Sequence, residues 1–141
     1  MRPHALSVLC IGIALGVALP GCGRSFRSAE IGDKAMYPTL QQSEVLNVQV
    51  FRQGTEISFT NTSAREFGPC RMWLNQWFSR EVDSIAIGET KTLDLSTFED
   101  RYGEPFRAGG FFATRRAAKV VLAQIESEGK LIGLIVVENK Q

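Results

Sequence analysis

Histidine is nearly absent from this chain of 141 residues, since His4 is the only one. Without histidine in the body of the chain there can be no Ser-His-Asp or Cys-His nucleophile. Histidine-ligated zinc and copper sites are excluded for the same reason. The three cysteines, Cys10, Cys22 and Cys70, are too few and too scattered for a thiolate cluster. We therefore expect no metal site, no cofactor and no enzyme activity.

Neither sign of charge prevails. Lys and Arg number 16 against 15 Asp and Glu, a net charge of +1. This balance excludes a strongly basic nucleic-acid binder and an acidic solvating tail. Gly109-Gly110 lacks the following Lys-Ser/Thr of a phosphate-cradling loop. Hydrophobic residues make up 44%, which is ordinary for a globular protein, and the length allows one domain with short appendages.

The chain has one long uncharged run, Ala5–Leu19, of 15 residues. It follows a short start with one cation, Arg2, and ends at Leu19-Pro20-Gly21-Cys22. A membrane-spanning helix needs about 20 apolar residues, so the run is short for a permanent span. The pattern instead predicts a secretory signal. The alternative is an uncleaved helical anchor.

The end of this run resembles the lipobox of bacterial lipoproteins, in which Leu19, Gly21 and Cys22 match and Pro20 departs. The resemblance implies a signal peptide over residues 1–21 and lipidation of Cys22 by thioether-linked diacylglycerol and an amide-linked acyl chain such as palmitate. Gly23, in place of Asp, favours the outer over the inner membrane. We thus expect a bacterial cell-envelope protein, attached to the membrane through its lipid anchor, with its domain in the periplasm or at the cell surface.

Removal of the signal changes the composition of the mature chain. His4, Arg2 and Cys10 leave with it, so 15 cations face 15 acids and the net charge becomes zero. Cys22 is committed to lipid, and Cys70 remains as the one thiol. Cys70 is expected to be a small buried side chain, with intermolecular pairing as the alternative.

Residues 22–43 have no sustained period and predict a flexible tether, with Tyr37-Pro38 as its first contact with a domain over residues 44–141. Short alternating runs separated by turn residues then predict an all-β domain, an antiparallel sandwich of about 7–9 short strands. The expected strands are 45–50, 56–60, 71–74, 77–82, 85–87, 92–95, 119–125 and 131–137. The last two are apolar at successive positions and are expected to be central.

The segment Ile85–Leu95, IAIGETKTLDL, resembles a hairpin that recurs in immunoglobulin-like and fibronectin-type domains. The resemblance covers 11 residues. It implies an immunoglobulin-like sandwich and no activity.

Two tryptophans flank a predicted turn at Asn75-Gln76. A two-residue turn would pair Leu74 with Trp77 and place Trp73 opposite Phe78, with the tryptophans on opposite faces. Trp73 is expected in the core. Trp77 either packs against a loop or forms an exposed platform for a sugar or a partner.

The longest irregular segment, Glu99–Arg116, is rich in aromatic residues and arginine, the composition of interaction hot spots. The alternative is a loop packed by its own side chains that caps the sandwich. Phosphate, anionic glycans or lipid headgroups would satisfy its arginines. The candidate binding residues are Trp77, Arg101, Tyr102, Arg107, Arg115 and Arg116.

We therefore expect a lipid-anchored, non-enzymatic binding or assembly module that presents this segment to an envelope protein. The first alternative is a carbohydrate-binding module that uses Trp77, Tyr102 and Trp73. The second is a hydrolase that uses carboxylates alone, for which the carboxylate pairs are Glu81/Asp83, Glu99/Asp100 and Glu126/Glu128. Nucleic acid is not expected as a partner.

Overall fold

The computed structural model describes residues 35–137, and this part of the chain is all-β. Its one helical element is a single 3-10 turn, Leu95–Thr97. The structure has seven strands in the described range: β1 Gln42–Gln53, β2 Glu56–Thr60, β3 Cys70–Leu74, β4 Phe78–Val82, β5 Thr90–Asp94, β6 Ala123–Ser127 and β7 Lys130–Val137.

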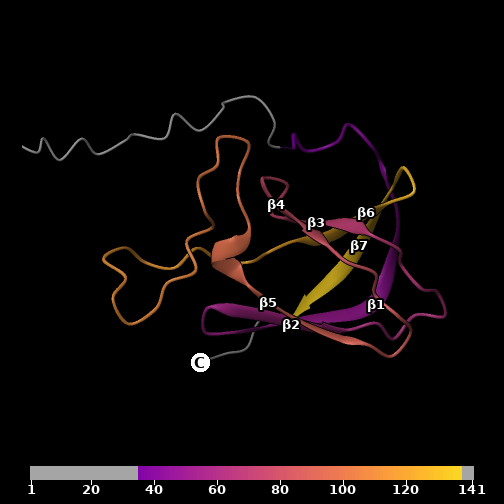
Figure 1. The fold of residues 1–141 in the computed structure, drawn as a ribbon, viewed down its shortest axis with the longest axis horizontal. Helices are drawn as coiled ribbons and strands as arrows, with labels where there is room; N and C mark the ends of the chain where they lie inside the picture. Colours follow the sequence, from indigo (N-terminus) through magenta and orange to yellow (C-terminus); the bar gives the residue numbers. More distant parts are fainter. Residues whose placement is uncertain (1–34, 138–141) are drawn as a thin grey trace, which may run out of the picture.

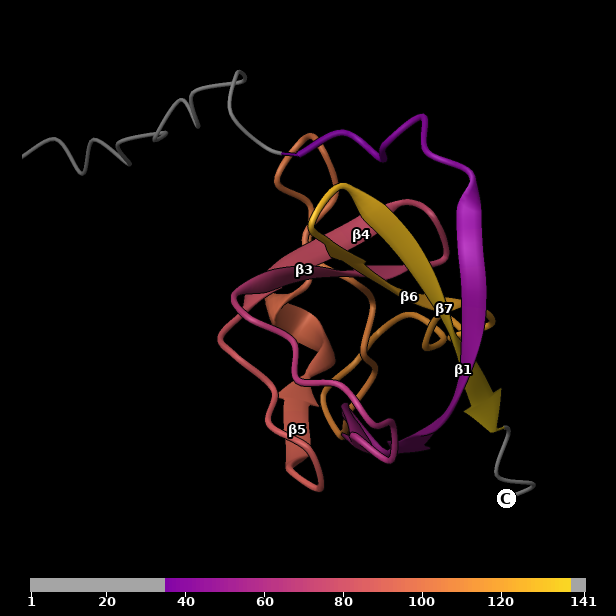
Figure 2. The same ribbon diagram turned by 90° about the vertical axis from the view of Figure 1, so that its right-hand side faces the viewer.

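The strands form one continuous sheet in the order β4-β3-β6-β7-β1-β2-β5. The sheet curls, with β7 and β1 at the bend and its two edges brought to the same side (Figure 1 and Figure 2). The expectation of a purely antiparallel arrangement is wrong, because β1 runs parallel to β7. The 12-residue β1 joins the two arms, because it pairs parallel with β7 on one side and its last residues pair antiparallel with β2 on the other. Its ladder to β7 is irregular between Val45 and Gln49.

The main core fills the inside of the curl. Alternate residues of both arms point into it, as the two-residue period of a strand requires, and examples are Val50 and Ile57 from one arm and Met72 and Ile132 from the other. β6 and β7 occupy central positions and are buried at successive residues, so that prediction is confirmed.

A second, smaller buried cluster lies on the outer face of β3 and β6, beneath residues 35–41. Trp73 is 1% exposed, as expected, but it belongs to this cluster and not to the main core. The Tyr37 ring meets Trp73 edge-on at 5.3 Å, and the Tyr37 hydroxyl donates to Gln124 Oε1 at 2.9 Å. Trp73 Nε1 donates to Glu126 Oε2 at 2.7 Å. The segment before β1 therefore covers this face, and β1 itself starts two residues earlier than the expected domain start at residue 44.

The β3–β4 hairpin has a different register from the one predicted. Leu74 pairs with Phe78 and Trp73 with Ser79. Asn75 and Gln76 do adopt the expected positive φ, at 54° and 59°. Trp77 nevertheless stays in the turn, with its backbone N–H bonded to Leu74 O at 3.1 Å, so the loop has one residue more than expected.

Two other expected strands differ in the structure. Residues 85–87 form only an isolated bridge, Phe67 to Ile85, and residues 119–122 precede β6 without joining it. The reason at 119–122 is the Asn75 side chain, which accepts from the backbone N–H groups of Val121 and Leu122 at 2.9 and 3.2 Å. It thereby takes donors that a strand ladder would use.

Candidate functional site

The segment that follows the 3-10 turn and precedes β6 is irregular, as predicted, but its first part is firmly packed. Phe106 is 2% exposed and meets Phe78 edge-on at 5.0 Å. Short bridges join Glu99 to Ser79 and to Pro105. Phe106 and Glu99 therefore fix this part of the segment to β4.

Arg52, at the end of β1, closes the base of the loop formed by the rest of this segment. Its guanidinium donates to the carbonyl oxygens of Ala108, at 2.6 Å, and of Ala118, while Nε donates to Gly54 O at 3.0 Å. Ala118 N also donates to Arg107 O at 2.9 Å. Burial lowers the pKa of Arg52, yet an arginine stays protonated in proteins. We name residues 109–117, which lie beyond this closure, the Phe loop.

The tip of the Phe loop carries the two most exposed large apolar side chains of the described range. Phe111 is 96% exposed and Phe112 91%, and the rings touch edge-on at 5.0 Å. The loop projects away from the strands at one side of the molecule (Figure 1). Arg107, Arg115 and Arg116 are exposed around it. Three of the predicted binding residues thus lie in the Phe loop or next to it in the chain, together with two exposed aromatic rings that the prediction left out of the site.

Trp77, Arg101 and Tyr102 form a separate surface cluster around Asp100. Trp77 Nε1 donates to Asp100 Oδ2 at 3.2 Å, and the backbone N–H groups of Tyr102 and Glu104 donate to Asp100 Oδ1 at 2.8 and 2.9 Å. The Arg101 guanidinium lies 4.6 Å from the Tyr102 ring centroid. Trp77 and Tyr102 are each about half exposed. The predicted binding residues therefore divide between two places.

The Asp100 carboxylate orders this cluster and is itself nearly buried. Burial acts to raise its pKa, but the hydrogen bonds from Glu104, Tyr102 and Trp77 and the charge of Arg101 outweigh it and lower the pKa. Asp100 is therefore charged at neutral pH and fixes the backbone of residues 100–104.

Two of the other predicted carboxylates are engaged in structural contacts. Glu81 pairs with Arg71 at 2.7 Å, and Glu126 accepts from Trp73. Glu128 lies in the β6–β7 turn at φ 50°, so it does not share a strand face with Glu126 as expected. Within residues 35–137 no three His, Cys, Asp or Glu side chains are grouped as metal ligands would be.

Cys70 is buried, as predicted. Burial raises the pKa of its thiol to about 11, although the charge of Lys91 opposes this. A thiol with so high a pKa is protonated at neutral pH and is a poor nucleophile.

Arg52, Asp100 and Asn75 shape the site. The sequence analysis did not name Arg52, and it named Asp100 only in a carboxylate pair and Asn75 only as a turn residue. Arg52 and Asn75 act through backbone groups far away in the chain, and no local pattern signals such a contact. Asp100 accepts from the backbone N–H groups of Tyr102 and Glu104, which follow it closely in the chain. Only the position of Asn75 in a predicted turn hinted at its conformation.

Cys22 and the expected signal lie outside the described residues, and among the described helices none is long and apolar enough to cross a membrane. Comparison of the chain with protein-family models, curated proteins and solved structures gave no match.

Proposed function

We propose that this protein is a non-enzymatic binding module of the bacterial cell envelope, held to the membrane by a lipid on Cys22, that presents the Phe loop to a protein partner. The observation that carries the proposal is the pair of rings at Phe111 and Phe112, which are almost fully exposed at the end of a loop whose base is fixed. Exposing two adjacent aromatic rings to water is unfavourable, and burial of one ring contributes about 1.5–3 kcal/mol.

The fixed base favours binding over mere flexibility. Arg52 and the Ala118–Arg107 bond close the loop on both sides before any partner arrives. A loop that is ordered in advance loses less conformational entropy on binding. A segment that combines exposed phenylalanine rings with arginine matches the composition of protein-interface centres, where aromatic side chains and Arg are enriched.

An immunoglobulin-like architecture forms part of the same proposal. The sheet order places β3, β4, β6 and β7 on one arm and β1, β2 and β5 on the other. In an immunoglobulin domain the third, sixth and seventh strands form one sheet and the first, second and fifth belong to the other. Domains of this kind commonly use the loops between strands for recognition, and the Phe loop is part of the connection between β5 and β6.

Cross-linking in cells tests the binding proposal. A cross-linker should capture a discrete envelope protein with the wild-type chain, and Phe111→Ser with Phe112→Ser should abolish this capture. Arg107→Ala with Arg115→Ala should weaken it. Ile87→Ser, which changes an exposed apolar residue outside the loop, is the matched control and should leave capture unchanged. Equal capture by all variants would refute the assignment of the Phe loop.

A carbohydrate-binding module is the second candidate, and the cluster around Asp100 favours it. Two half-exposed aromatic rings, an arginine and a carboxylate lie together there, and sugars bind to such surfaces by stacking and hydrogen bonds. Trp73 cannot take part because it is buried. A glycan array or a peptidoglycan pull-down should be positive for this candidate and should be lost in Trp77→Ala. A negative array for the wild-type protein would reject it.

The lipid anchor has its own test. Cys22→Ser should abolish labelling of the chain by a radioactive or clickable fatty acid, because the thioether can form only on the cysteine sulfur. A Cys70→Ser variant keeps the site and should be labelled normally. Persistent labelling of Cys22→Ser would overturn the proposed anchor.

A further inference from the structure

The two exposed rings of the Phe loop sit at the corner of a tight turn. The Ala113 backbone N–H donates to Gly110 O at 3.1 Å. This bond closes a β-turn over residues 110–113, with Phe111 and Phe112 at its two central positions. The turn holds both rings together at the tip of the loop.

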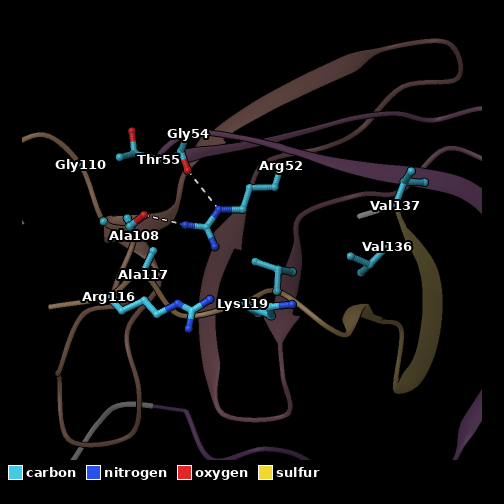
Figure 3. A pocket seen from close by; sticks show the side chains of 12 residues that line it. Arg52, Gly54, Thr55, Ala108, Gly110, Arg116, Ala117, Lys119, Val136 and Val137 are labelled. Carbon is cyan, nitrogen blue, oxygen red and sulfur yellow. Dashed lines mark hydrogen bonds between the residues drawn. The ribbon is translucent and has the colours of Figure 1, made fainter. Parts of the chain in front are cut away.

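The base of the loop is as narrow as glycine permits. Gly109 adopts a φ of +86°, and a Cβ there would lie 2.8 Å from the Ala117 Cβ, closer than two such atoms approach. Only glycine therefore lets the two sides of the base meet. Figure 3 shows this base from close by, with the bond from Arg52 to Ala108 and the Arg116 side chain in the wall of a cavity. The tip is thus carried on a constricted base before it meets a partner.

The rings of Phe111 and Phe112 stand perpendicular to each other, with an interplanar angle of 90°. Both are almost fully exposed, so a partner that buries them has to cover ring faces that point in two directions. A flat surface can lie against only one of two perpendicular faces. The surface that receives the tip must therefore be concave.

The charges that accompany the rings in the chain have one sign. Residues 105–125 contain four cations and no Asp or Glu. Arg107 lies four residues before Phe111, Arg115 lies three residues after Phe112, and both arginines are exposed. A negatively charged surface would be attracted to this segment and steered toward it.

From the fixed turn, the perpendicular rings and the single sign of charge, we infer that the partner of the Phe loop is a protein with a concave apolar pocket whose rim carries Asp and Glu side chains. The inference rests on the proposed function and specifies its partner. The pocket buries the two rings. The rim carboxylates accept hydrogen bonds from Arg107 and Arg115, because the planar fork of arginine matches the geometry of a carboxylate.

A lipid bilayer is the other surface that takes up aromatic and cationic side chains. Its hydrocarbon chains are fluid and adapt to any apolar shape, so a bilayer gains nothing from rings that are fixed at right angles. The lipid proposed on Cys22, with several acyl chains, already provides stable attachment to the membrane. The fixed tip therefore favours a protein pocket.

Photo-cross-linking followed by peptide mapping tests the pocket. A photoreactive phenylalanine analogue replaces Phe112 in the full chain, and isolated cell envelopes are irradiated. Mass spectrometry then identifies the molecule and the peptide that are joined to position 112. The expected peptide lies in an apolar pocket of an envelope protein, with carboxylates at the rim of that pocket. A lipid adduct, or a protein site without an acidic rim, would overturn the inference.

Charge variants test the rim separately. With the analogue at position 112, Arg115→Glu should lower the adduct yield about tenfold or more, because like charges then face each other. Arg115→Lys keeps the positive charge and should retain most of the yield. Lys130→Glu makes the same change in charge at an exposed position at the start of β7, and as the matched control it should leave the yield unchanged. Equal yields from Arg115→Glu and Lys130→Glu, or an equal loss in both Arg115 variants, would overturn the acidic rim.

The outcomes separate this inference from the proposed function. Absence of any adduct from position 112 contradicts the proposed function, and the inference fails with it. A discrete protein adduct whose yield does not respond to the charge at position 115, or whose site is not acidic, supports the Phe loop as a binding surface and overturns the inference alone.

Discussion

Phenylalanine 106 and the pair Phe111–Phe112 lie within six residues of one another in the chain but in opposite environments. Phe106 is 2% exposed and contacts Phe78, whereas Phe111 and Phe112 are more than 90% exposed. Truncation of a buried phenylalanine to alanine costs about 3–5 kcal/mol, because it removes the transfer free energy and leaves a cavity. Truncation of a fully exposed one usually changes the free energy of unfolding by less than about 0.5 kcal/mol.

Urea denaturation measures this difference. Trp73, which is buried against Tyr37, provides a fluorescence signal for unfolding. With a slope of about 1–3 kcal/mol/M for a domain of this size, a cost of about 3–5 kcal/mol means that Phe106→Ala should lower the midpoint by about 1–5 M. Phe111→Ala with Phe112→Ala should leave it nearly unchanged. If the alanine variant is too unstable to fold, the urea midpoint of Phe106→Leu, which keeps most of the side-chain volume, is measured instead. The reasoning is refuted if Phe106→Ala costs less than about 1 kcal/mol, or if the exposed pair costs more.

Three further predictions concern single residues. Asn75→Gly should be less destabilising than Asn75→Ala. Both variants lose the side-chain bonds to residues 119–122, but only glycine adopts the φ of +54° without strain. Equal midpoints of thermal unfolding for the two variants would contradict this conformational argument. Asp100 has a lowered pKa in the folded state, so its contribution to stability is present above the unfolded pKa of about 3.9 and is lost as the pH falls through the folded value. Wild type should therefore lose more stability than Asp100→Asn between neutral pH and pH 3. If the urea midpoints of the two proteins fall by the same amount over that range, the argument is refuted. Cys70 should react slowly with a thiol reagent at pH 8 because burial holds its pKa near 11, and rapidly in urea; a fast reaction in the folded chain would show that the thiol is accessible.

The strands were predictable from sequence where a two-residue period dominates. Glu56–Thr60 alternates cleanly and forms β2 with the expected bounds. Leu131–Val137 is apolar at successive positions and lies at the centre of the sheet as β7. In both cases the pattern of a single segment carries the information, because burial on one face or on both leaves its mark on successive residues.

Features set by distant contacts were not predictable. The register of the β3–β4 hairpin depends on Trp77, whose indole bonds to Asp100 more than 20 residues later. Lys119–Leu122 has the composition of a strand, yet Asn75 binds its backbone. The parallel pairing of β1 with β7 brings together the two ends of the domain, and no local signal specifies it.

The candidate site divides in the same way. The composition of Glu99–Arg116 predicted that this segment binds a partner and that its arginines take part. The exposure of Phe111 and Phe112 and the burial of Phe106 could not be distinguished, because all three are phenylalanines in an aperiodic stretch. The role of Arg52 depends on its contact with Ala108, 56 residues away.

Photo-cross-linking from position 112 tests the proposed function most directly. A photoreactive phenylalanine analogue at Phe112, in cells that produce the full chain, should yield one discrete adduct with an envelope protein. The same analogue at Ile87, which is also exposed, should yield none, and Arg107→Ala with Arg115→Ala should weaken the adduct from position 112. No adduct from position 112, or the same adduct from both positions, would contradict the account of the Phe loop as the binding surface.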